Sequence, residues 1–209
     1  SEKESYRSKK NRVVSLNGIG NISLRIGDNA TADSVFRKAL AGERELNSAL
    51  GQAINYANIG AIFEEENMLD SAWAYYRKSL EMNIEAKSEL GISLCHSYFG
   101  NLYKKEGYVE KAIAEYEKAY QMENKIDDWH WLNFCIALVN IYIDQNNYSK
   151  ALQLLDKANQ KATSGQSLDH LASIYGLYSI VYDRIGNTQK AYDSYKLSKT
   201  YNDSVLSQQ

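Results

Sequence analysis

The sequence predicts an all-α fold, an α-solenoid in which five helix-turn-helix repeats wind into a superhelix. Three sets of positions that recur with one period support this prediction. The first is an alanine in the second helix of each repeat, followed four positions later by an aromatic residue or leucine. The pairs are Ala32/Phe36, Ala72/Tyr76, Ala112/Tyr116, Ala151/Leu155 and Ala191/Tyr195. They lie 40, 40, 39 and 40 residues apart, and a fixed period of about 20–50 residues is typical of repeat architectures.

The other two sets have the same spacing. The second set lies in the first helix of each repeat and joins an apolar residue to a smaller one in most copies: Ile19-Gly20, Ile59-Gly60, Phe99-Gly100, Leu138-Val139 and Tyr178-Ser179. The third set holds residue types that accept a positive φ where a helix ends: Gly27, Asn67, Gly107, Asn146 and Gly186. The small residues let the paired helices approach closely. We expect Leu16/Ile19, Tyr56/Ile59 and Phe99/Tyr103 to face the partner helix.

Taken in order, the periodic positions predict ten helices. The first helices of the repeats are expected near 12–26, 52–66, 92–106, 131–145 and 168–185. The second helices are expected near 29–48, 69–88, 109–126, 148–162 and 188–206. Asp28, Asp70 and Ser149 are N-terminal helix signals. Because Thr163–Ser167 interrupts the fourth repeat, we expect its second helix to be the shortest.

The domain prediction is a single array over residues 1–209. Its repeats lie near 12–51, 52–91, 92–130, 131–167 and 168–206. Residues 1–11 align with the end of a second helix, so they are interpreted as the tail of a preceding repeat. Neither end carries a polar cap, which solenoid ends need. We therefore expect the chain to be a segment of a longer protein.

In these positions the chain resembles the tetratricopeptide repeat (TPR) family over nearly its whole length. It differs from the family pattern in three ways: the period is about 40 instead of 34, the usual tryptophan position holds Leu16, Tyr56, His96, Cys135 and Tyr175, and the chain has no proline. The resemblance implies the long-period variant found in bacterial sensor and transcription regulators, peptide-sensing response proteins and kinesin light chains. Without the proline, we expect the second helices to run on by about 1.7 turns.

Composition argues against several functions. The formal net charge is -2 with no basic stripe, so nucleic-acid binding is not expected. No run of 18 apolar residues is present, so no membrane span is predicted. The three histidines, His96, His130 and His170, lack zinc spacing, and there is no phosphate loop or nucleophile elbow. We therefore expect no enzyme activity, no metal and no cofactor. Cys95 and Cys135 are expected to be buried free thiols.

The predicted binding surface is the stripe of each first helix that faces away from its partner helix, which the resemblance places in the concave groove of the superhelix. The candidate groove residues are Asn17, Asn21, Arg25, Asn101, Lys104, Lys105, Asn140, Asp144 and Arg184. Asn21, Asn101 and Asn140 share one position of the repeat. In the family, an asparagine there often bonds the backbone of an extended peptide, and an amide can both donate and accept; the alternative is a bond to a neighbouring helix. The lysine of the family's carboxylate clamp is absent, because its place holds Asn17, Ser97 and Ile136.

The functional hypothesis is a protein- or peptide-binding module, the sensor or interaction segment of a larger bacterial signalling or transcription regulator. The alternative is a stand-alone cytoplasmic scaffold or a peptide-pheromone-type regulator. The expected partner is a protein or peptide in the groove, and a homodimer is possible. The compartment is left open between a periplasmic segment of a membrane-anchored regulator and the cytoplasm.

Overall fold

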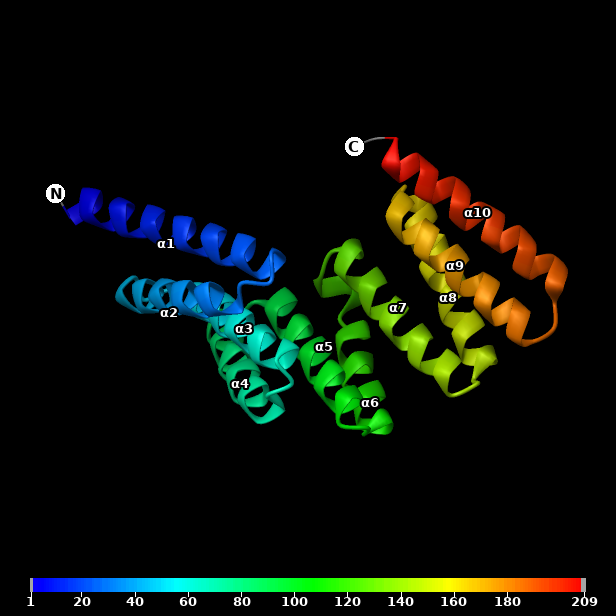
Figure 1. The fold of residues 1–209 in the computed structure, drawn as a ribbon, viewed down its shortest axis with the longest axis horizontal. Coiled ribbons are helices and arrows are strands. Elements are labelled where there is room, and N and C mark those ends of the chain that lie inside the picture. The colour runs from blue at the N-terminus through cyan, green and yellow to red at the C-terminus, as the bar shows by residue number, and fades with distance from the viewer. Residues whose placement is uncertain (1, 208–209) are drawn as a thin grey trace. The chain divides into compact units, whose positions relative to one another are not determined.

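The computed structural model describes residues 2–207, which form ten α-helices, one 3-10 helix and no strand (Figure 1). The elements are α1 (Glu2–Arg25), α2 (Asn29–Glu45), α3 (Ala49–Glu65), α4 (Leu69–Glu85), α5 (Glu89–Lys105), α6 (Val109–Tyr120), η1 (Glu123–Lys125), α7 (Asp128–Asp144), α8 (Tyr148–Ser164), α9 (Leu168–Arg184) and α10 (Thr188–Leu206). Odd-numbered helices are the first helices of the repeats and even-numbered helices are the second. This all-α helical-repeat fold confirms the predicted class.

The chain divides into two compact units, residues 1–107 and 108–209. In the first unit, α1 pairs with α2 and α3 with α4, while α5 packs on both α3 and α4. In the second unit, α7 pairs with α8 and α9 with α10, and α6 packs on α7. Residues 2–11 continue into α1 without a turn, so they are not a separate element. The single array over residues 1–209 stays a prediction.

The helices are more even in length than the sequence suggested. Each of α2, α3, α4, α5, α7, α8 and α9 has 17 residues. The five turn residues within repeats all have a positive φ, between 57° and 82°, as predicted. Turns between repeats use a second such set that sequence reasoning missed: Asn47, Lys87 and Gln166, with φ of 51° to 53°. Asn47 and Lys87 follow α2 and α4, which end at Glu45 and Glu85, three residues before the bounds expected from the sequence.

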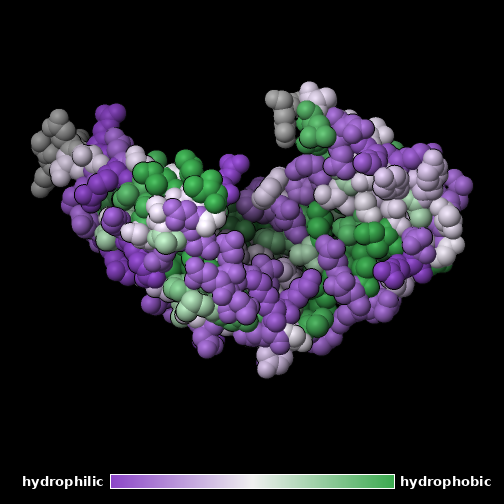
Figure 2. All heavy atoms as spheres, in the orientation of Figure 1, coloured by the Kyte–Doolittle hydropathy of each residue, from purple (hydrophilic) through white to green (hydrophobic). Residues whose placement is uncertain are grey.

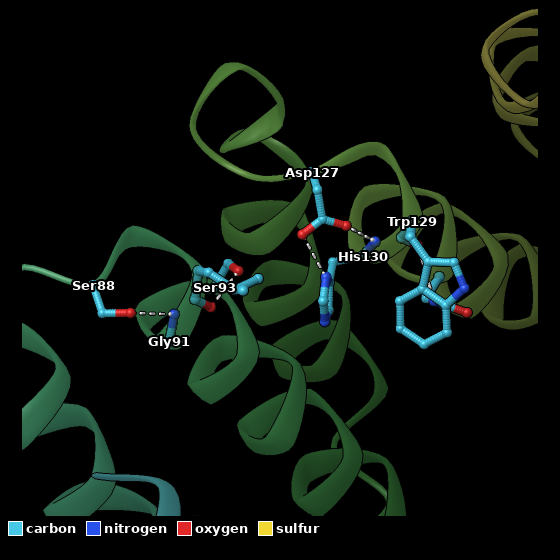
Figure 3. Close-up of polar contacts among 8 residues, drawn as sticks. Ser88, Gly91, Ser93, Asp127, Trp129 and His130 are labelled. Carbon is cyan, nitrogen blue, oxygen red and sulfur yellow. Dashed lines mark hydrogen bonds and ion pairs between the residues drawn. The ribbon is translucent and has the colours of Figure 1, made fainter. Parts of the chain in front are cut away.

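Serine and aspartate side chains start several of the first helices. Ser48 Oγ accepts from the Gly51 N–H at 3.0 Å at the start of α3, and Ser88 Oγ accepts from the Gly91 N–H at 3.1 Å at the start of α5. Asp127 does the same for α7, where Oδ1 accepts from the His130 N–H at 3.1 Å. Figure 3 shows the caps of α5 and α7. Each cap satisfies a backbone donor that the helix itself leaves unpaired.

The irregular second helix is in repeat three, not in repeat four. α6 ends at Tyr120 after 12 residues and is followed by η1, whereas α8 has 17 residues and ends at Ser164, with Gln166 of the expected break forming its turn. Gly51 and Gly91 lie directly against Glu43 and Asn83 of the preceding helix, and a Cβ on either glycine would clash.

At the matching place in α7 stands His130, opposite Glu123 of η1. A histidine at this glycine position accompanies the irregular end of α6. The next repeat also has a histidine there, His170, but the small Ala162 lies opposite, and α8 stays regular.

The repeated Ala-aromatic pairs form the core. Phe36 packs with Tyr56 and Ile59 of the next first helix. Tyr76 packs in the same way with Cys95 and Phe99. Tyr195 is 52% exposed, because no helix follows α10 among the described residues. Both cysteines are buried and free, as predicted.

One facing residue was wrongly predicted. Ile19 is 50% exposed, and Val13 and Gly20 face α2 in its place. α1 packs mainly on α2, whereas α3 packs on α2, α4 and α5 and so buries the matching Ile59. α1 therefore carries the exposed apolar side chains Val14 and Ile22, and Ile26 follows it in the turn; Figure 2 shows hydrophobic residues gathered over the first unit.

Candidate binding groove

A groove of about 360 Å³ opens between the first helices α3 and α5 of the first unit, and α4 forms its floor. Its walls are mainly apolar: Leu50, Ile54, Leu90, Leu94 and Tyr98, with Asn58 among them. Leu50 and Ile54 are 47% and 49% exposed. Large apolar side chains with this exposure, gathered in one concave place, are typical of a binding surface.

The repeat itself builds these walls. Leu50 and Ile54 of α3 lie 40 residues before Leu90 and Leu94 of α5, so each wall presents the same pair of apolar residues at i and i+4. Side chains four apart lie on one helix face. In the second unit the same positions hold Trp129 and Asn133 on α7, and Asp169 and Ser173 on α9. The apolar groove is therefore a property of repeats two and three.

Polar groups in the floor are already satisfied. Ser79 Oγ donates to the Ala53 carbonyl at 2.8 Å, and Asn83 Nδ2 donates to Ser79 Oγ at 3.4 Å. Ser79 and Asn83 are 1% and 4% exposed. Because these groups already bond within the protein, binding does not require the ligand to supply hydrogen bonds to the floor.

Tyr98 supplies a hydroxyl on the α5 wall. Its ring stacks on Tyr76 with centroids 4.6 Å apart. Burial, with the nearby Cys95 and Glu64, raises the pKa of Tyr98 to about 12. The phenol therefore keeps its proton at neutral pH and can donate a hydrogen bond to a ligand.

The C-terminal ends of α3 and α5 are tied together by an ion pair. Lys105 Nζ lies 3.2 Å from Glu64 Oε1 and donates to the Glu64 carbonyl at 2.9 Å. Tyr76 donates its hydroxyl proton to Glu64 Oε2 at 2.7 Å. Lys105, a candidate groove cation, thus bridges two neighbouring first helices.

The nine candidate residues divide between the two units. The first unit carries Asn17, Asn21 and Arg25 on α1 and Asn101, Lys104 and Lys105 on α5; the second carries Asn140 and Asp144 on α7 and Arg184 on α9. Asn21, Arg25, Lys104, Lys105, Asp144 and Arg184 are exposed, and the three other asparagines are half-buried. None of the nine lines the groove formed by the described residues of α3, α4 and α5. Asn101 comes nearest along the chain, one turn after Tyr98.

The asparagines differ in what they bond. Asn140 Nδ2 donates to the Ile136 carbonyl of its own helix at 2.8 Å, which occupies one of its two amide hydrogens. Asn17 Oδ1 is buried and has no hydrogen-bond partner among the described residues. A role in peptide binding for the Asn column, which is Asn21, Asn101 and Asn140, stays a prediction.

Sequence reasoning missed the groove walls because its candidates on α1 and α5 begin late along the helix, at Asn17 and Asn101, and it named none on α3. The signal that could have found them is the recurrence of Leu50/Leu90 and Ile54/Leu94 at the repeat period. Among residues 2–207, no helix is both long and apolar enough to cross a bilayer, and no three His, Cys, Asp or Glu side chains gather as metal ligands would.

Comparison with known proteins finds one repeat of a known type and a similar fold. Residues 99–126 match the model of the tetratricopeptide repeat. BtubC from P. vanneervenii is similar in structure, with a TM-score of 0.77 at 16% identity, covering 98% of this chain and 92% of that one. Aspartyl phosphate phosphatase F from Bacillus subtilis has a TM-score of 0.82 at 17% identity, covering 98% of this chain and 54% of its own length.

The TPR-like repeats of a kinesin light chain from Podosopora anserina have a TM-score of 0.71 at 14% identity, covering 93% of this chain and 96% of that one. At such identities, similarity in structure shows the fold alone. None of the curated proteins matches this chain in sequence.

Proposed function

Because the chain carries a tetratricopeptide repeat at residues 99–126 and has a TPR-like helical-repeat fold, we propose that it is a protein- or peptide-binding module whose ligand lies between α3 and α5. The observation that supports this most directly is the apolar groove, whose walls repeat Leu50/Ile54 as Leu90/Leu94. A groove with one apolar pair on each side suits an extended peptide that inserts apolar side chains. The proposal is of binding, with no reaction at this site.

The groove's chemistry sets the expected ligand. Leu50 and Ile54 lose water when an apolar side chain enters, which stabilises the complex by roughly 25 cal/mol per Å² of apolar surface buried. The hydroxyl of Tyr98 and the amide of Asn58 offer hydrogen bonds to a peptide backbone. Asn101, one helical turn beyond Tyr98, would bond the next peptide unit along α5.

Selection from a random peptide library displayed on phage tests the proposal. Peptides selected on the wild-type protein are measured again on Ile54→Glu, which places a charge on an exposed groove wall without disturbing the core. Ile84→Glu is the matched control, because Ile84 is 57% exposed on α4 and does not line the groove. We expect Ile54→Glu to weaken binding by about ten-fold or more and Ile84→Glu to leave it unchanged. Equal binding to both variants would show that the ligand lies elsewhere.

The Asn column is tested with the same peptides. Loss of one hydrogen bond costs roughly 0.5–1.5 kcal/mol. Asn101→Ala should therefore lower the affinity for a peptide that extends along α5 by about 2- to 10-fold. Asn140→Ala and the double variant test the second unit. Retention of full affinity in the double variant would confine the site to the apolar walls.

We further propose that the module belongs to a larger bacterial signalling or transcription regulator. Support comes from the 40-residue period, which the chain shares with the long-period repeats of such regulators. Reading the gene beyond Gln209 tests the proposal. A membrane helix, a histidine kinase domain or a helix-turn-helix domain in the same frame would support it, and a frame holding repeats alone would favour a scaffold or a pheromone-type regulator.

A further inference from the structure

A second cavity, of about 470 Å³, lies in the second unit on the side of the second helices, between α6 and α8 over α7. It is separate from the groove between α3 and α5. Its wall includes Leu154, the rings of Tyr120 and Tyr142, and charged side chains of both signs, Glu117 and Lys157 among them. The volume is within the range of pockets that hold small organic groups.

The repeat shows what normally fills this place. Residue 75 matches residue 154, and in the first unit Tyr75 fills the corresponding space between α2 and α4. Its ring stacks on Phe63 with centroids 5.3 Å apart, and its hydroxyl accepts from Arg37 Nη1 at 2.7 Å. Lys78 lies over the same ring, 5.4 Å from the centroid.

The second unit keeps most of this arrangement and lacks the ring. Tyr142 stands where Phe63 provides the stacking face, and Lys157 stands where Lys78 lies over the ring. Leu154 replaces Tyr75 and leaves the space open. Glu117 stands in place of Arg37, so the group that meets the hydroxyl is an acceptor instead of a donor.

We propose that this cavity binds a tyrosine side chain presented by a protein or peptide partner. The partner's ring stacks on Tyr142 as Tyr75 stacks on Phe63, and the Lys157 ammonium lies near the ring face. The partner's phenol donates a hydrogen bond to the Glu117 carboxylate, which accepts another, of 3.3 Å, from the Tyr142 hydroxyl. A phenol suits the cavity better than a plain ring, because Glu117 has no donor of its own to offer.

Titration with N-acetyl-L-tyrosinamide, followed by NMR, tests the proposal. We expect saturable shifts of the Leu154 methyl resonances and nuclear Overhauser contacts from the added ring to Leu154 and Tyr142. N-acetyl-L-phenylalaninamide should bind about 2- to 10-fold more weakly, because it lacks one hydrogen bond. N-acetyl-L-leucinamide, which has no ring to stack, should bind more weakly still.

Leu154→Tyr supplies the ring from within the chain, as Tyr75 does in the first unit, and should abolish the shifts. Leu197→Tyr is the matched control, because Leu197 is 41% exposed on α10 and does not line the cavity. Unchanged binding to Leu154→Tyr would overturn the proposal. If that variant does not fold, the wild-type contacts decide alone, and their absence at Leu154 and Tyr142 overturns it as well.

Discussion

Gly18 and Gly20 lie two residues apart in α1 and face different surroundings. A Cβ on Gly20 would lie 2.5–2.9 Å from the ring of Phe36, which is fully buried, whereas a Cβ on Gly18 meets nothing within 4 Å. We predict that Gly20→Ala destabilises the protein by about 1–3 kcal/mol through overpacking. Gly18→Ala should stabilise it by about 0.5–1 kcal/mol, because alanine favours a helix. Urea unfolding measures both, and the same sign for the two changes would contradict the packing.

Because of Tyr98, we expect the free energy of unfolding to fall as the pH rises in the alkaline range. Burial raises its pKa from 10.0 to about 12 in the folded protein. A folded pKa above the unfolded one gives stability that is complete below the unfolded value and is lost as pH rises through the folded value. We therefore predict that the melting temperature falls between about pH 10 and 12, and falls less in Tyr98→Phe. Parallel curves for the two proteins would mean that Tyr98 titrates normally.

At the scale of elements, the turns between repeats carry strain that glycine would remove. Lys87 has a φ of 53°, in the left-handed region that costs an L-residue roughly 1–2 kcal/mol. Lys87→Gly should therefore raise stability by about 0.5–1 kcal/mol, after the loss from a more flexible unfolded chain. Asn67→Gly is the control, since asparagine tolerates a φ of 59° and should gain less. A loss of stability in Lys87→Gly, seen by thermal unfolding, would show that the lysine side chain has another role.

Two tryptophans near the irregular end of α6 should respond differently. Trp131 is 2% exposed, and its Nε1 donates to the Tyr120 carbonyl at the end of α6 at 3.0 Å; Trp129 is 54% exposed. Trp131→Phe leaves that carbonyl without its donor and creates a void, so we expect a loss of about 1–3 kcal/mol. Trp129→Phe should stay within about 0.5 kcal/mol of wild type. Similar losses in chemical denaturation would contradict the proposed role of Trp131.

The elements that sequence predicted well are those that depend on local chemistry repeated many times. The turn residues at Gly27 and Asn67 and the buried Phe36 and Tyr76 follow from conformation and period, and the structure confirms them. The early end of α6 at Tyr120 could not be predicted, because the change from glycine to histidine at His130 recurs at His170, where the preceding helix α8 stays regular. The prediction that Ile19 faces α2 was wrong because the burial of Ile19 depends on how many helices pack on α1. The sequence of α1 does not show that number.

The candidate site was predicted less well than the fold. Sequence reasoning proposed the first-helix surface, but it overlooked the apolar side chains of Leu50 and Ile54 there in favour of polar residues that suggest binding chemistry, such as Asn101. Apolar walls resemble core positions in sequence, and only the partial exposure of Leu50 and Ile54 separates them from the core. The cavity between α6 and α8 could not be predicted from the sequence. It exists because Leu154 stands at the position where Tyr75 fills the matching space in the first unit.

At the scale of the whole molecule, the two units predict two separate folding transitions. The first unit has cores around Phe36 and Tyr76 within residues 1–107, and the second has its own around Trp131, Leu138 and Leu155. In repeat proteins, stability is close to a sum of repeats and their neighbour contacts. The regular pattern of helices is interrupted at the start of the second unit, at α6 and η1.

We therefore predict that fragments 1–107 and 108–209, each expressed alone, are helical by circular dichroism and unfold cooperatively in urea. Because the denaturant slope grows with the surface exposed on unfolding, each fragment should have a smaller slope than a chain of 209 residues unfolding in one step. Fragments cut at Asn67, between the paired helices α3 and α4, are the control and should be much less stable. If fragment 1–107 or 108–209 is unfolded alone, then its core requires the other unit, and the two act as one cooperative structure.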